Sequence, residues 1–316
     1  MALCKKKTRH LFVSLLKKKQ RQIGLRHHPS RHKMIDPDLV IGNDVSMDEA
    51  GSDARLREIA SRFSELEYVE AVVLAGSAAG GTSDSQSDYD LYVYSHHPVN
   101  VAFRENLLRP RAQRLDLHRT FWEDEDAWIE PDAIEFQIMY RSCAWTEGEL
   151  SARLDRCEAM LGYTTAICYN IGRSRTLWDR SGWFGRMQGR LLQGYPERLA
   201  RAVIQKNLPV MGAIISSYER QIQAAFLRQD LVSLNHRVAA WLSSYFDILF
   251  AANRRFHPGE KRLLALAEEL PSVPESMIED VRTSCSQAGG LERCVADHLI
   301  LMRRRLEVWL KQKGFL

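Results

Sequence analysis

The sequence lacks several features that define other classes of protein. It has no run of 18 apolar residues, so no membrane-spanning helix is predicted. Its six cysteines include no Cys-x-x-Cys pair, which argues against a zinc site and against a disulfide framework. No Gly-Lys-Ser or Gly-Lys-Thr follows a glycine-rich segment, so the chain has no Walker phosphate-binding loop. We therefore expect a cytoplasmic protein with reduced thiols.

Basic residues are scarce once the amino-terminal segment is set aside. Residues 1–33 hold 11 of the 44 lysines and arginines and no Asp or Glu, so residues 34–316 contain 33 basic against 40 acidic residues. The body of the protein is therefore acidic, although the whole chain has a formal net charge of +4. An acidic body disfavours a nucleic acid partner, whose phosphates need a basic surface. Residues 1–40 are predicted to be a disordered basic tail, or to precede a true start at Met34.

The first half of the remaining chain mixes helical and strand patterns. Apolar residues recur at helical spacing after the capping-box sequence Ser46–Glu49, whereas residues 134–140 alternate as in a half-buried strand. Residues 111–132 fit neither pattern, because aromatic and acidic side chains are interleaved there. The patterns predict helices over residues 48–66, 101–108 and 146–161, and strands over residues 69–75, 89–94, 134–140 and 176–179.

The second half shows helical patterns only, separated by prolines and paired glycines. The predicted helices cover residues 197–228, 231–253, 260–270, 274–287 and 290–312. This change of character predicts two domains: an α/β domain at residues 41–190 and a helical, substrate-binding domain at residues 191–316.

A short segment between two predicted strands carries the chemistry. Gly76 has no Cβ, so the backbone there can bring its N–H groups close to phosphate oxygens, and Ser77 adds a hydroxyl donor. Asp88 and Asp90 follow at the start of the next strand, where residues two apart point to the same face. Two carboxylates on one face suit Mg²⁺, which keeps coordination positions open for water and substrate phosphates.

A third carboxylate is expected to come from a neighbouring strand. Glu135 is the best candidate, because Ile134, Phe136 and Ile138 take the buried face of its strand. It would act as a general base or as a further metal ligand. Asp116, between two leucines, is the alternative.

These motifs resemble a known superfamily. Gly76-Ser77, followed after ten residues by Asp88-x-Asp90, resembles the signature of the nucleotidyltransferase superfamily of DNA polymerase β and kanamycin nucleotidyltransferase. The string GSAAGGTSDSQSDYDLYVY is similar to a bacterial subgroup with the pattern GSxAxGxxxxxSDxDLxVY, some of whose members have no assigned substrate. Segments at residues 177–182, 246–253 and 256–261 extend the resemblance over about residues 45–265.

The resemblance implies an α+β fold, with a mixed sheet flanked by helices as the palm and an all-helical domain after it. It implies a Mg²⁺-dependent nucleotidyltransferase that uses two ions and moves a nucleoside monophosphate, AMP from ATP, to an acceptor hydroxyl. Asp88, Asp90 and Glu135 would bind metal and catalyse transfer. Gly76, Ser77, Ser87 and Lys261 would contact the nucleotide. The chain departs from the family pattern in having Glu135 rather than Asp at the third acidic position, and Ala79 where relatives carry a larger residue.

The acceptor is left open by the sequence. The acidic body favours a cationic small molecule such as an aminoglycoside, whereas a protein or RNA acceptor is the alternative, and RNA would suit the basic tail. A second class of function is a non-catalytic, nucleotide-binding or antitoxin-like partner protein that keeps the palm. The oligomeric state is not predicted.

Overall fold

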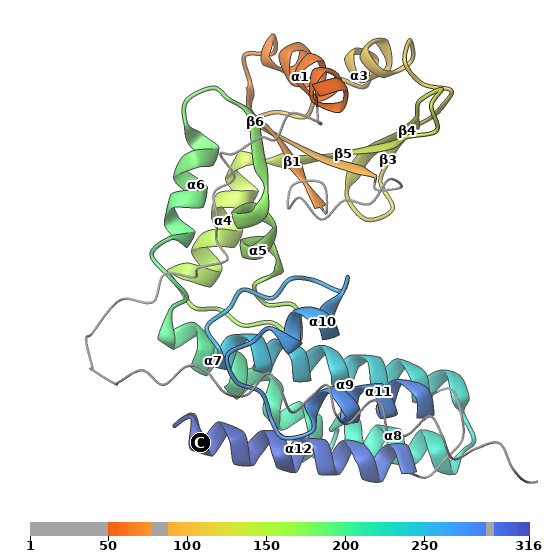
Figure 1. Cartoon of the computed structure of the whole chain (residues 1–316), viewed down its shortest axis with the longest axis vertical. Coiled ribbons are helices and arrows are strands. Elements are labelled where there is room, and N and C mark those ends of the chain that lie inside the picture. Colours follow the sequence, from red (N-terminus) through yellow and green to blue (C-terminus); the bar gives the residue numbers. More distant parts are fainter. Residues whose placement is uncertain (1–49, 77–87, 289–293) are drawn as a thin grey trace, which may run out of the picture. The chain divides into compact units, whose positions relative to one another are not determined.

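The computed structural model describes residues 50–76, 88–288 and 294–316 (Figure 1). The predicted basic tail, the capping box at Ser46–Glu49, and two predicted nucleotide contacts, Ser77 and Ser87, lie outside the described residues. No helix of the described residues is long and apolar enough to cross a membrane.

The described residues contain one six-stranded sheet with the strand order β3-β4-β5-β2-β1-β6. Strands β2 and β5 are parallel, whereas the other neighbouring pairs are antiparallel, so the sheet is mixed. The strands are β1 (Val69–Ala75), β2 (Tyr89–Ser95), β3 (Arg114–Arg119), β4 (Asp124–Ile129), β5 (Glu135–Ser142) and β6 (Arg175–Asp179). This sheet confirms the α+β fold class.

Helices cover both faces of this sheet because each face presents a separate apolar surface. Leu91, Val93 and Phe136 form one core with α1 (Ala50–Ser64) and α3 (Val101–Leu108). Tyr94 lies on the opposite face and packs against the other helices of this half. These helices are α4 (Cys143–Leu154), α5 (Ala166–Arg173) and α6 (Trp183–Leu191).

After α6 the elements of the described residues are all helical. Its elements are α7 (Glu197–Leu208), a π-helical turn η3 (Pro209–Ala213), α8 (Tyr218–Leu227), α9 (Leu231–Ala252), α10 (Leu263–Glu268), α11 (Met277–Gln287) and α12 (Cys294–Gln312). The long helix α9 supplies much of their shared core, including Trp241, Tyr245 and Leu249. The predicted domain boundaries themselves remain a prediction.

Two sequence predictions are wrong in detail, and two parts of the fold were not predicted. Residues 111–132, which showed no pattern, form the hairpin β3–β4 at one edge of the sheet. Helices α5 and α6 were not predicted. The helix expected from residue 146 to 161 begins at Cys143, because Ser142 caps it by accepting a hydrogen bond from the Trp145 amide, and it ends at Leu154. The single helix predicted over residues 197–228 is interrupted between η3 and α8.

Candidate functional site

The candidate site begins where β1 ends. Gly76 follows the last residue of β1 and has φ +68°, in the left-handed region that other residues rarely adopt. A Cβ built on Gly76 would overlap the Oδ2 atom of Asp90. Glycine is therefore required here for two reasons, the backbone conformation and the close approach of a carboxylate.

Asp90 is the second residue of β2 and lies beside this glycine, and Asp88 directly precedes the strand. Their side chains share one face of the strand, and both are half-buried. Tyr89 between them points to the other face, where it stacks on Phe136 with ring centroids 4.9 Å apart. The stacked pair fixes the alternation of the strand and so holds both carboxylates on the same side.

The parallel strand β5 brings Glu135 to the same edge. Tyr89 pairs with Phe136 and Asp90 pairs with Gln137, so Glu135 stands one position earlier, level with Asp88. Glu135 is exposed, and its Oε1 accepts a hydrogen bond of 3.2 Å from the Gln137 amide. Because parallel strands begin at the same end of a sheet, the acidic side chains gather there.

The electrostatics of Asp90 show that four charged groups share this environment. Burial raises the pKa of Asp90 above its ordinary value, and the negative charges of Asp88 and Glu135 raise it further. The ammonium group of Lys261 acts in the opposite direction and lowers the same pKa. Lys261, predicted from sequence to contact the nucleotide, is thus brought near the acidic residues although it is 171 positions away in the chain.

Asp116, the alternative third carboxylate, lies elsewhere. Asp116 of β3 pairs with Ala127 of β4, and Ala127 pairs with Gln137 of β5. Gln137 in turn pairs with Asp90 of β2, so three strand spacings separate the two aspartates. At ~4.8 Å per spacing this is roughly 14 Å. Asp116 also accepts a hydrogen bond of 3.2 Å from Arg114. The structure therefore places Glu135, and not Asp116, beside the aspartates; the catalytic role of Glu135 remains a prediction.

The turn that carries Lys261 is anchored by His257, a residue that sequence reasoning missed. The His257 side chain is fully buried, and its Nδ1 accepts a hydrogen bond of 3.1 Å from the Gly259 amide. Its own amide donates to Thr165 Oγ1 at 2.8 Å. Burial lowers the pKa of His257 to about 4, so the ring is neutral and Nδ1 is free to accept. The sequence signal was the His-Pro-Gly turn directly before Glu-Lys.

A second missed residue, Asp247, joins α9 to the segment before α5. Its carboxylate accepts hydrogen bonds from the amide and hydroxyl of Thr164, at 3.1 and 2.6 Å, and from the Asn207 side chain at 3.3 Å. Burial is the largest cause that raises the pKa of Asp247, to about 6. The signal was an aspartate inside the apolar run Tyr245–Ala252.

The donor set at the strand ends fits a magnesium ion better than a closed metal cage. Within the described residues, no group of three or more His, Cys, Asp and Glu side chains is arranged to hold a metal. Asp88 and Asp90 are nevertheless two oxygen donors on one face. Mg²⁺ commonly takes one or two carboxylates and completes its shell with water and substrate phosphates, so the pair fits this ion.

Two family models match the chain. Residues 56–155 match the nucleotidyltransferase domain, and this range contains β1, β2 and β5 with Gly76, Asp88, Asp90 and Glu135. Residues 165–263 match DUF4037, a domain of unknown function, which contains Asp247, His257 and Lys261. No curated protein sequence matches the chain significantly.

Solved structures with a similar course of the chain are distant in sequence. A nucleotidyltransferase-like protein from Exiguobacterium sibiricum has 11% identity and a TM-score of 0.41, over 83% of this chain and 76% of that protein. The CCA-adding enzyme of Thermotoga maritima, solved with tRNA, has 11% identity and a TM-score of 0.29, over 89% and 86% of the two chains. Values this low support no conclusion about substrate.

The family match and the site geometry concern the same strands. The predicted superfamily is confirmed by the domain match, whereas the bacterial subgroup suggested by the longer motif remains a prediction. Residues 56–155 of this chain thus carry a nucleotidyltransferase domain, whereas residues 165–263 match a domain of unknown function.

Proposed function

We propose that this protein is a Mg²⁺-dependent nucleotidyltransferase that moves AMP from ATP to an acceptor hydroxyl and releases pyrophosphate. The observation that carries the proposal is that Asp88, Asp90, Glu135 and Lys261 gather at one end of the sheet. They lie next to position 76, which only glycine can occupy. Two or three carboxylates and one lysine are complementary to a metal-bound triphosphate.

Each group has a distinct task in this reaction. Asp88 and Asp90 would hold Mg²⁺, and substrate oxygens would complete the coordination of two ions. The bound metal would neutralise charge on the phosphate oxygens. The Gly76 backbone, Ser77 and Ser87 would contact the triphosphate, and Lys261 would pair with its negative charge. Their combined effect is to position the nucleotide and to stabilise developing charge.

The chemical step is a displacement at the α-phosphorus of ATP. The acceptor oxygen forms a bond to this phosphorus, the bond to the bridging oxygen of pyrophosphate breaks, and the acceptor proton goes to the carboxylate of Glu135. Glu135 suits this task because it is exposed and therefore accessible to a second substrate, whereas Asp90 is more deeply buried.

The acidic body favours a cationic, hydroxyl-bearing acceptor such as an aminoglycoside. Residues 34–316 have seven more acidic than basic residues, and an excess of negative charge attracts cations over a distance. A protein or RNA acceptor is the competing proposal. A non-catalytic nucleotide-binding role is the second class of function, and it requires ATP binding without pyrophosphate release.

The direct test is incubation of the full chain with α-labelled ATP, Mg²⁺ and a panel of acceptors or a cell extract. We expect pyrophosphate release and a labelled acceptor whose mass rises by one AMP. Asp88→Asn should reduce product at least about 1,000-fold, because a charged group that stabilises the transition state is lost. Asp116→Asn is the matched control and should retain activity. Equal product from wild type and Asp88→Asn would refute the proposal.

A further inference from the structure

The groove between α8 and α9 carries three arginines that have no partner among the described residues. The cavity there has a volume of about 290 Å³, and its lining includes Arg220, Arg228 and Arg237 with Gln221 and Ser233. No acidic side chain of residues 50–76, 88–288 or 294–316 lines it. Within the described part of the chain, none of the three guanidinium groups forms an ion pair or hydrogen bond with a protein group.

The two helices place these arginines around one opening. Arg220 and Arg228 are eight residues apart on α8 or at its end, so they share a helix face with Ala224 between them. Arg237 comes from the facing helix α9, one turn after Ser233, and is half-buried. The charges therefore converge from two helices instead of spreading along one exposed face.

Acidic residues near the groove in sequence already have other partners. Glu219 is buried and accepts a hydrogen bond of 2.7 Å from Arg303 of α12. Asp230 caps α9 by accepting a hydrogen bond of 3.0 Å from the Ser233 amide. The positive charge of the three arginines is consequently not balanced by these two carboxylates.

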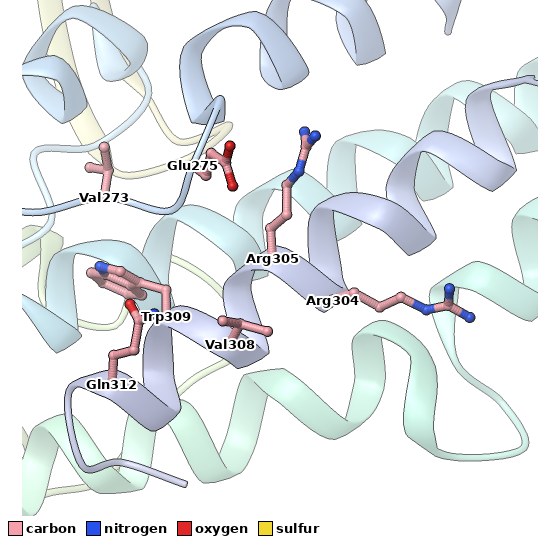
Figure 2. A pocket seen from close by; sticks show the side chains of 7 residues that line it. All are labelled: Val273, Glu275, Arg304, Arg305, Val308, Trp309 and Gln312. Carbon is pink, nitrogen blue, oxygen red and sulfur yellow. The ribbon is translucent and has the colours of Figure 1, made fainter.

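A second cavity of about 280 Å³, beside α12, shows the contrasting arrangement (Figure 2). Glu275 lines it together with Arg304 and Arg305. Arg305 donates to both carboxylate oxygens of Asp280 at 2.7 and 2.8 Å, so its charge is paired. The two cavities are similar in volume, but only the α8–α9 groove combines three arginines with no acidic lining residue.

We propose that the α8–α9 groove is an anion-binding site for a phosphate group. Guanidinium groups form paired hydrogen bonds with phosphate oxygens, and three of them from two helices can contact one phosphate from different sides. A bound phosphate would also relieve the repulsion between the arginines. The phosphate is carried either by a nucleic acid backbone or by a small phosphorylated molecule. This proposal does not depend on nucleotidyl transfer.

The test measures binding of pyrophosphate and of a single-stranded RNA oligonucleotide to the full chain by titration calorimetry, at low salt with EDTA present. Arg237→Gln and Arg220→Gln should each weaken binding roughly 10-fold, since a charge-assisted hydrogen bond is lost. Arg304→Gln is the matched control, because Arg304 is also exposed and unpaired within the described residues. Every variant keeps the palm unchanged, so a difference between variants reports on the groove.

The outcomes separate the sources of the phosphate. If the groove variants weaken binding of RNA and pyrophosphate does not bind, the ligand of the groove is a nucleic acid backbone. If they weaken binding of pyrophosphate and RNA does not bind, the ligand is a small phosphorylated molecule. Absence of binding by both probes, or equal weakening by Arg304→Gln, would overturn the proposal. Unaltered thermal unfolding of Arg220→Gln, which replaces an exposed side chain, ensures that a lost signal reports on binding.

Discussion

The start of β2 and the middle of α9 each contain a carboxylate whose pKa is raised by burial, yet the two environments differ. Asp247 in α9 accepts hydrogen bonds from Thr164 and Asn207. Asp90 in β2 accepts no hydrogen bond from a described residue, and its charged neighbours include the carboxylates of Asp88 and Glu135. The first carboxylate is satisfied by hydrogen bonds from the protein, whereas the second has none from a described residue and, in the proposed function, binds a cation.

This difference is the one expected between a structural carboxylate and a ligand-binding carboxylate, which is the role proposed for Asp90. A buried polar group with partners stabilises one conformation, because removing it leaves donors unsatisfied. Half-buried carboxylates that repel each other destabilise the unliganded protein, and a bound cation would offset that repulsion. Substitution of Asp90 should therefore raise stability and abolish activity, whereas substitution of Asp247 should lower stability.

The largest effect is expected for Asp90→Asn. Transfer should fall at least about 1,000-fold, because a predicted metal ligand is lost. The melting temperature without Mg²⁺ should rise at pH 7. The pKa of Asp90 is higher in the folded protein than its ordinary 3.8, so its contribution to stability is lost as pH rises through the folded value. Asn does not ionise, so the variant does not lose this stability as the pH rises. If Asp90→Asn is less stable than wild type and fully active, Asp90 is a structural carboxylate and not a metal ligand.

Asp247→Ala should instead destabilise the fold by about 2–4 kcal/mol, because buried donors of Thr164 and Asn207 lose their acceptor. Asp297→Ala, at an exposed position in the first turn of α12, is the control and should cost less than about 1 kcal/mol. Urea unfolding measures both. Asp247 has a folded pKa of about 6, so wild type should lose stability from pH 4 to pH 7 relative to Asp247→Ala.

Lys261→Met should raise the KM for ATP roughly 10- to 100-fold, the range expected when a charged contact worth about 1.5–3 kcal/mol is removed. Lys261 lowers the pKa of Asp90, so its loss raises that pKa further. The acidic limb of the activity profile should therefore move to higher pH. Lys311→Met, at an exposed position on α12, should leave both quantities unchanged. If the pH profile of activity does not shift, Lys261 does not act on Asp90 in the site.

The smallest effect is expected for His257→Phe, which keeps the ring but removes the Nδ1 acceptor of the Gly259 amide. We expect the KM for ATP to rise about 5-fold, from loss of a hydrogen bond of about 1 kcal/mol, with kcat unchanged. His257→Asn should restore the KM, because its Oδ1 can replace Nδ1 as acceptor. If the KM for ATP rises equally in His257→Phe and His257→Asn, the effect comes from packing alone. His257 then has no role in positioning Lys261.

Most strands and helices were readable from periodicity, and the exceptions have physical causes. The edge hairpin β3–β4 was missed because acidic residues such as Glu125 and Asp126 occupy buried positions, where they pair with arginines and not with apolar neighbours. Arg104 reaches Asp124 from α3 at 2.6 Å, a partnership that no local pattern predicts. Apolar alternation identifies a strand only where burial is apolar.

The sequence by itself determined which side chains meet at the start of β2. Local spacing places Asp88 and Asp90 on one face, and glycine at position 76 is a local requirement of backbone conformation and close approach. Only the tertiary structure decided between Glu135 and Asp116 as neighbour of these aspartates, because strand order is a long-range property of the sheet. It also decided which groove arginines lack a partner among the described residues, since their potential partners come from distant helices.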